Sequence, residues 1–239
     1  MELILHEKPK RPVIIEGFPG IGFVGTIAVE YMINHLKTRS IGHIFDEKIP
    51  PIAMIHGDDT RRLLEVFYAP KQNLVFVHAI AGIKGIEWKV SETILELAKT
   101  LNAKEIISLE GVVSPLEDGL SRIFIKSNYP KAEKEFRKMG LEKLESGAVT
   151  GVTGALMLKS DHVNSTFLFA ETSVGMPDSR SAAELIKYLD VYLGLKIDPK
   201  PLRKQAEVFE NKLKDMIKVS TKAQNEIKDV KPEDLSYLG

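Results

Sequence analysis

The sequence predicts a three-layer α/β/α fold with a largely parallel or mixed sheet. Short runs rich in β-branched and aromatic residues alternate with segments of helical periodicity, which is the pattern of such folds. The chain has 239 residues, of which 44% are hydrophobic, so it is long enough to bury one large core. We therefore expect an α/β core domain over residues 1–197.

Each predicted element follows from its own pattern. The apolar run at residues 13–18 indicates a buried strand that ends in a turn, and the next segment has apolar residues at helical spacing. Residues 56–62 read as a turn or hairpin tip, since Gly-Asp-Asp supplies turn chemistry. The remaining predicted strands are 40–45, 51–56, 63–69, 73–80, 104–112, 121–127 and 164–172, and the predicted helices are 24–36, 87–101, 131–139 and 181–195.

A helical segment is predicted after the core, over residues 198–230, followed by a short tail over residues 231–239. Asp198 and Pro199 form a helix start signal, with Asp as N-cap and Pro at the first helical position. A heptad-like seam then follows, which indicates a helix packed either on its own domain or on another subunit. The seam consists of Leu202, Ala206, Phe209, Leu213, Met216, Ser220, Ala223, Ile227 and Val230.

The charge balance and the residue types exclude several classes of function. The 33 basic and 33 acidic residues cancel, so we expect no nucleic acid and no membrane as partner. The chain has no cysteine, which excludes disulfides, thiolate nucleophiles and cysteine-ligated zinc. The first residues lack the pattern of a signal peptide, and no apolar run is long enough to span a bilayer, so a cytoplasmic location is expected.

The stretch "EGFPGIGFVG" contains Gly20, Gly22 and Gly25 at the spacing of the dinucleotide-binding fingerprint, and Asp46 lies about the expected distance beyond it. Glycines in this position let the backbone approach a pyrophosphate at a helix N-terminus. Three glycines at a strand-to-helix turn also arise for tight packing of main chain against main chain. The pattern alone therefore leaves both nucleotide binding and packing open.

Three blocks of sequence, in this order, resemble the proteasome assembly chaperone family, and in particular its archaeal members. They are "GFPGIGFVG", "GVTGALM" and "AETSVGMPDSRSAAELIKYLDVYLGLKID", and the resemblance extends to about Lys212. It implies a fold similar to nucleoside phosphorylases and related hydrolases, without their activity and without a cofactor. It also implies that one loop is a structural signature of the fold. This loop consists of Gly17, Pro19, Gly20, Gly22 and Gly25.

The resemblance also implies a non-enzymatic protein that forms a homo-oligomer and contacts proteasome α-subunits or a homologous chaperone. Some members of the family, like proteasome activators, end in a hydrophobic residue, a tyrosine and one final residue. This chain ends in Leu235, Ser236, Tyr237, Leu238 and Gly239, so its tyrosine is third from the end. The tail either docks on α-subunits, folds back on its own oligomer, or has no role.

No catalytic or metal-binding set is predicted from the remaining polar residues. Glu171 and Asp178 could form an acid–base pair, but a structural interpretation is preferred. In it Glu171 ends a strand, and Asp178 or Ser179 is the N-cap of the next helix. Glu110 ends a strand where α/β sites usually lie, but it could equally bind backbone amides of nearby loops. Ser114 has no recognisable histidine partner, and Trp88 is expected in the core or an interface.

The glycine-rich stretch "SGAVTGVTGALM" at residues 146–157 indicates either a second phosphate-like loop or a helix packed closely on the sheet. The six histidines show no paired metal spacing. Two functions remain as hypotheses. One is the assembly chaperone or proteasome-associated scaffold, and the alternative is a nucleotide- or nucleoside-binding enzyme that uses the Gly20-Gly22-Gly25 loop.

Overall fold

The computed structural model describes residues 1–56, 59–80, 82–113, 121–173 and 176–204. Within them, one sheet has the strand order β1-β3-β6-β7-β2-β8-β11-β9-β10, and β4 and β5 form a separate hairpin. The strands are β1 (Glu2–Leu5), β2 (Val13–Gly17), β3 (Arg39–Phe45), β4 (Ala53–His56), β5 (Asp59–Arg62), β6 (Leu64–Ala69), β7 (Leu74–Ala79), β8 (Glu105–Val113), β9 (Ile123–Ser127), β10 (Glu142–Lys143) and β11 (Ser165–Thr172).

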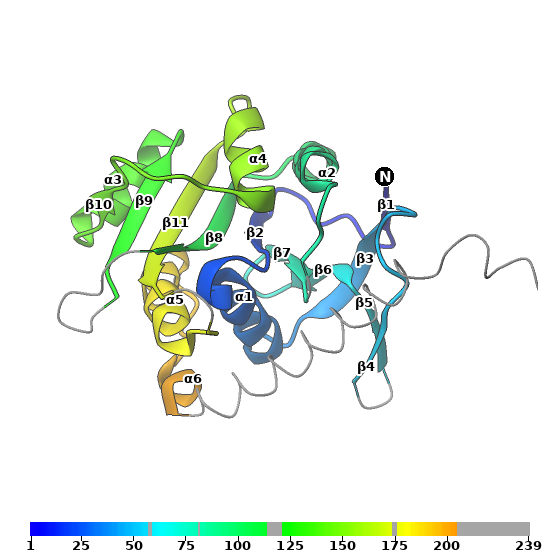
Figure 1. Cartoon of the computed structure of the whole chain (residues 1–239), viewed down its shortest axis with the longest axis horizontal. Helices are drawn as coiled ribbons and strands as arrows, with labels where there is room; N and C mark the ends of the chain where they lie inside the picture. Colours follow the sequence, from blue (N-terminus) through cyan, green and yellow to red (C-terminus); the bar gives the residue numbers. More distant parts are fainter. Residues whose placement is uncertain (57–58, 81, 114–120, 174–175, 205–239) are drawn as a thin grey trace, which may run out of the picture.

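Helices cover both faces of the sheet, so the predicted three-layer α/β/α architecture is confirmed. Figure 1 shows α1 and α5 on one side of the sheet, and α2 and α4 on the other. The helices are α1 (Val24–His35), α2 (Glu87–Leu101), α3 (Pro130–Lys138), α4 (Gly151–Lys159), α5 (Ser179–Leu193) and α6 (Lys200–Lys204), with a 3₁₀ turn η1 (Ile21–Phe23) before α1.

The sheet is mixed, with a parallel centre and antiparallel flanks. β2 pairs in parallel with both β7 and β8, and β8 pairs in parallel with β11. Strands β3, β6 and β7 are joined antiparallel, as are β9 and β11. The central strands are buried along their whole length because helices lie on both faces, which explains their nearly continuous apolar sequences.

The structure differs from the sequence prediction at three strands. β1 and β10 were not predicted, since one is a four-residue edge strand and the other has two exposed residues. Residues 59–62 form β5, in the segment predicted as a turn or hairpin tip. The "GVTGALM" stretch is the helix α4, which agrees with the packed-helix interpretation; its two glycines weaken helix propensity, so packing on the sheet stabilises it.

Two single-residue predictions can also be compared with the structure. Trp88 was expected in the core or an interface, but its side chain is 52% exposed at the start of α2, so a core position is wrong. Asp198 accepts a hydrogen bond from the amide of Lys200 at 3.0 Å, as a residue at a helix start does. Leu202 in α6 is buried in the core with α1 and α5, and the rest of the predicted seam lies outside the described residues.

Candidate functional site

The carboxyl ends of β2, β8 and β11 meet at one edge of the sheet, since these three strands are parallel neighbours. In the strand order, the strand that follows β2 in the chain, β3, lies beyond β7 in the direction of β1. The strand that follows β8, β9, lies beyond β11 in the opposite direction. The crevice between such oppositely directed connections is where ligands bind in open α/β sheets. The predicted glycine loop and Glu110 both lie at this edge.

The glycine loop is in close contact with its own backbone. A Cβ added to Gly17 would come closer than 3.0 Å to the carbonyl oxygen of Gly25, and one added to Gly25 would do the same to the oxygen of Leu109. Gly22 has a φ of +63°, and an added Cβ would lie 2.5 Å from the Thr172 hydroxyl oxygen. These contacts join β2, α1, β8 and β11, which supports the packing role predicted for the loop.

The loop is also fixed to the start of α5 through Asp178. The Asp178 amide donates to the carbonyl of Gly22 at 2.8 Å. The Asp178 carboxylate accepts from the amides of Arg180 at 3.1 Å and Ser181 at 2.9 Å, and from the Thr172 hydroxyl at 2.8 Å. Of the two predicted N-cap residues, Asp178 is therefore the one that caps the helix.

Replacing Asp178 by Ala is expected to destabilise the protein by about 1–2 kcal/mol, because the N-cap acceptor of α5 and the Thr172 contact are lost together. Urea unfolding followed by circular dichroism measures this change. Asp161→Ala is the matched control, since Asp161 is exposed in the turn after α4 and should change stability by less than about 0.5 kcal/mol. Equal effects of the two substitutions would contradict the capping role.

The carboxylate of Glu110 lies where a dinucleotide fold would place a phosphate. Its Oε1 accepts from the amide of Gly111 at 2.9 Å, and the amide of Ile21 in the glycine loop also donates to this carboxylate. A Cβ on Gly20 would come closer than 3.0 Å to the same carboxylate oxygen. The loop thus already holds a carboxyl group of the chain itself, and a pyrophosphate would have to share the site with this acidic group.

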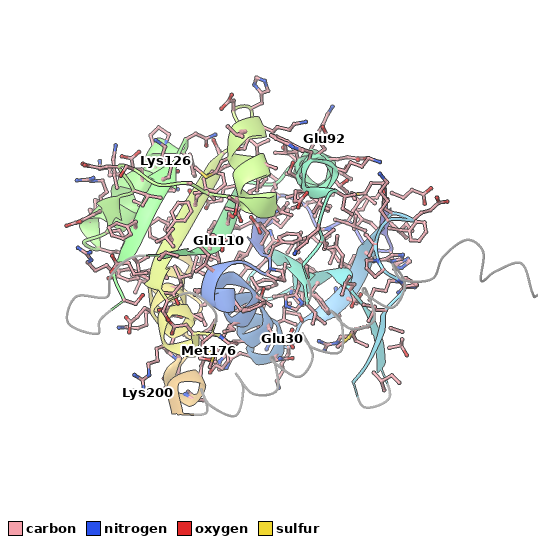
Figure 2. All side chains as sticks on the ribbon, viewed as in Figure 1. Glu30, Glu92, Glu110, Lys126, Met176 and Lys200 are labelled. Atoms are coloured by element: carbon pink, nitrogen blue, oxygen red, sulfur yellow. The ribbon has the colours of Figure 1, made fainter. Side chains whose placement is uncertain are left out.

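Glu110 is connected to a second, fully buried carboxyl group by two hydroxyl groups. The Thr153 hydroxyl of α4 donates to Glu110 Oε2 at 3.2 Å, and it lies 3.4 Å from the Ser108 hydroxyl oxygen. Ser108 in turn is hydrogen bonded to Glu16 of β2. Figure 2 shows Glu110 near the centre of the molecule, in β8, three residues before the strand ends. We name Glu16, Ser108, Thr153 and Glu110 the acid chain.

Both carboxyl groups of the acid chain bind protons more tightly than ordinary glutamates. Burial raises the pKa of Glu16 to about 8; the Ser108 hydrogen bond opposes this shift, and the charge of Glu110 adds to it. Burial also raises the pKa of Glu110 to about 7, against the hydrogen bonds from Gly111, Thr153 and Ile21. Among the described residues, neither carboxylate forms an ion pair with a lysine or arginine.

Asp46 does not belong to this site, although the dinucleotide pattern pointed to it. It follows β3, which is separated from β2 by β6 and β7, about 14 Å at the usual strand spacing. Its carboxylate accepts from the amide of Lys48 at 3.0 Å and lies 3.4 Å from the amine of Met1. The acidic residue of the fingerprint is therefore paired elsewhere, and this part of the nucleotide hypothesis is wrong.

The other candidates from the sequence either have a structural role or lie outside the described residues. Glu171 is 1% exposed and pairs with Arg122 at 2.8 Å, at the end of β11 as interpreted from the sequence. Within the described part of the chain, no group of three or more His, Cys, Asp or Glu side chains could hold a metal ion, and no helix is long and apolar enough to cross a bilayer. Ser114 and the tail residues Leu235, Tyr237, Leu238 and Gly239 lie outside the described residues.

Sequence reasoning identified Glu110 but missed its partners in the acid chain. One signal was present, namely a glutamate at position 16 inside a strand of otherwise apolar residues. A charged side chain is rarely fully buried unless it is paired, so Glu16 could have been singled out. Ser108 and Thr153 gave no comparable signal, because hydroxyl residues are common in strands and in the first turns of helices.

Comparison with known proteins places the chain among relatives of similar length. The crystal structure of PbaA from Pyrococcus furiosus, an archaeal homolog of proteasome-assembly chaperone, matches with a TM-score of 0.84 and 27% identity, over 93% of this chain and 99% of that one. PbaB from the same organism, an archaeal proteasome activator, shares the fold with a TM-score of 0.74 and 23% identity, over 90% of this chain and 97% of that one.

Sequence comparison agrees with the structural matches. An uncharacterized protein of Methanocaldococcus jannaschii is 28% identical over 229 residues, which cover 91% of this chain and 92% of that protein. The model of the PAC2 family matches residues 14–217, a range that includes the glycine loop, the acid chain and the start of the predicted C-terminal helical segment. The resemblance to the proteasome assembly chaperones is thereby confirmed, and the chain belongs to the PAC2 family.

Proposed function

We propose that this chain is a non-enzymatic, proteasome assembly chaperone-like scaffold that forms a homo-oligomer in the cytoplasm and contacts proteasome α-subunits. The observation that carries the proposal is the match to PbaA, an archaeal homolog of proteasome-assembly chaperone, over 93% of this chain with a TM-score of 0.84. The family membership over residues 14–217 supports the same role. A homologous chaperone is the other partner that this role allows.

The contact with α-subunits is assigned to the C-terminal tail, residues 231–239, and within it to Leu235, Tyr237, Leu238 and Gly239. Capture of a terminal carboxylate by a lysine, with an aromatic ring as anchor, would supply the affinity. The tyrosine is one residue further from the end than in the motif that the tail resembles. The offset displaces the carboxylate by up to roughly 3.5 Å along an extended chain, so we expect weak rather than tight docking.

Removal of the tail should abolish co-migration with α-subunits. We expect the full chain to shift the elution of purified α-subunits on size-exclusion chromatography, and a chain truncated after Lys231 to leave it unchanged. Tyr237→Ala should weaken binding by at least tenfold, because an anchoring aromatic side chain typically contributes 2 kcal/mol or more. Ser236→Ala is the matched control and should bind normally. Undiminished binding by the truncated chain would remove the tail from the proposal.

The nucleotide- or nucleoside-binding enzyme is the weaker alternative, because the Ile21 amide of the glycine loop already donates to Glu110 and Asp46 lies elsewhere. Thermal unfolding with NAD, FAD, nucleosides and phosphate separates the two functions. A ligand at 100 times its dissociation constant stabilises a protein by about 2.7 kcal/mol, which is a measurable rise in the unfolding temperature. The scaffold hypothesis expects no saturable rise with any of these compounds.

A further inference from the structure

A cavity of about 290 Å³ opens beside the acid chain, at the crevice between the ends of β2 and β8. At about 30 Å³ per water molecule, it holds roughly ten waters, which is the size range of a small metabolite. Its walls are formed by the glycine loop, the end of β8 and the start of α4. Its lining includes Phe18, Phe23, Glu110, Thr150, Gly151 and Val152.

One polar feature of the cavity is an acceptor without a cation. The carboxyl group of Glu110 lines the cavity and, among the described residues, pairs with no lysine or arginine. Strand alternation places Glu16 on the same face of the sheet as Ser108 and Glu110, beneath α4. Glu16 is 0% exposed, and its Oε2 has no hydrogen-bond partner among the described residues. Glu16 is not among the residues that line the cavity, so Glu110 is the carboxyl group that a ligand there can reach.

The second polar feature is a set of donors without an acceptor. Helix α4 has nine residues, its N-cap is Thr150, and no side chain in the described part of the chain caps it. The first amides of a helix have no partner within the helix, and they carry a partial positive charge. Thr150, Gly151 and Val152 line the cavity, so this helix start faces it.

The donor and acceptor features lie next to each other. Thr153, in the first turn of α4, donates to Glu110 at 3.2 Å, so the helix start and the carboxylate are within one side-chain length. The rest of the lining is mainly apolar and includes Phe18 and Phe23 from the two ends of the glycine loop. A matching ligand therefore carries a cation and an anion a few ångströms apart, together with a small apolar group.

We propose that this cavity binds a small zwitterion of the α-amino-acid class, with its ammonium group on Glu110 and its carboxylate at the first amides of α4. The apolar side chain of the ligand lies against Phe18, Phe23 and Val152. A simple anion such as phosphate would face the Glu110 carboxylate, and a simple amine would face the positive helix start. Only a ligand with both charges satisfies both walls. The site does not depend on the scaffold function, which would stand without it.

The experiment uses the full chain and four probes, namely glycine, L-alanine, L-valine and L-leucine. Binding is measured by isothermal titration calorimetry and by amide chemical-shift changes in ¹⁵N-labelled protein. Two half-ligands of valine serve as controls, since isobutylamine lacks the carboxylate and isovalerate lacks the ammonium group. We expect saturable binding of at least one amino acid, and at least tenfold weaker binding of both half-ligands to the same protein.

The residue assignment is tested with a matched pair of substitutions. Glu110→Gln should weaken amino-acid binding at least tenfold, whereas Glu96→Gln, on the exposed face of α2, should leave it unchanged. Chemical-shift changes should centre on the amides of Ile21, Gly111, Gly151 and Val152, a readout that needs no variant to fold. Absence of saturable binding by all four amino acids, equal binding of a half-ligand, or shifts confined to another region would each overturn the proposal.

Discussion

Replacing Glu16 by Gln is expected to remove a large part of the pH dependence of stability between pH 5 and pH 9. Glu16 is fully buried, and burial raises its pKa from 4.5 to about 8. Below pH 4.5 the carboxyl group is neutral in both the folded and the unfolded chain. As the pH rises toward 8, the unfolded chain releases this proton freely while the folded chain retains it, so the free energy of unfolding falls.

The expected loss is large because the shift is large. At about 1.4 kcal/mol per pKa unit, the shift of Glu16 corresponds to roughly 3–5 kcal/mol between pH 5 and pH 9. Glu110 adds to the loss over a lower range, up to about pH 7, since its pKa is also raised by burial. A glutamine at position 16 stays neutral throughout and can still hydrogen bond to Ser108, so its protein should be the more stable one at pH 9.

Urea unfolding at pH 5, 7 and 9 measures this dependence for both proteins. At pH 5 the Glu16→Gln protein should be equal to the parent or slightly less stable, and the order should reverse by pH 9. Glu96→Gln makes the same chemical change on the exposed face of α2 and should leave the pH dependence of the parent in place. If the Glu16→Gln protein loses stability with pH as steeply as the parent, the proton on Glu16 is not the cause.

The sequence predicted the layers of the fold because its central strands and main helices carry strong periodic patterns. The run at β2 and the helical spacing in α2 and α5 could be recognised without tertiary information. α4 was left as one of two interpretations, because its glycines and threonine make it a poor helix by propensity, and the helix is stabilised by packing against α2 and the sheet. β1 and β10 were missed because short edge strands have little pattern to detect.

The candidate site was predicted less completely than the fold. Glu110 could be singled out because the sequence predicts it at the carboxyl end of a strand, although β8 continues to Val113. Two interpretations were left open for it, namely a site residue and an acceptor for loop amides. In the structure Glu110 accepts hydrogen bonds from the amides of Gly111 and Ile21. The sequence was consistent with such bonds, but it did not identify which amides donate them. Its coupling to Glu16 depends on the register of β2 and β8, where Glu16 lies opposite Ser108. Register of this kind is a tertiary property that one sequence does not display.

Replacing Gly25 by Ala is expected to be among the most destabilising single substitutions in this protein, with a loss of about 4 kcal/mol or a failure to fold. A Cβ at this position would overlap the carbonyl oxygen of Leu109 in β8, a backbone atom that cannot rotate away as a flexible side chain would. The Cα of Gly17 lies 3.2 Å from the same added atom. α1 would therefore have to move off both β2 and β8, opening the buried core beneath it.

The comparison that isolates this effect is Gly147→Ala, in the exposed segment before α4. There an added Cβ has one neighbour within 4 Å, the Leu144 side chain at 3.8 Å, so the change in stability should stay within about 0.5 kcal/mol. Urea unfolding, or the yield of folded protein where Gly25→Ala does not fold, gives the difference. A mild effect of Gly25→Ala, equal to that of Gly147→Ala, would mean that helix and sheet can separate at this corner without cost. In that case close main-chain contact would no longer explain the glycine loop, and a role in holding a ligand would regain its place.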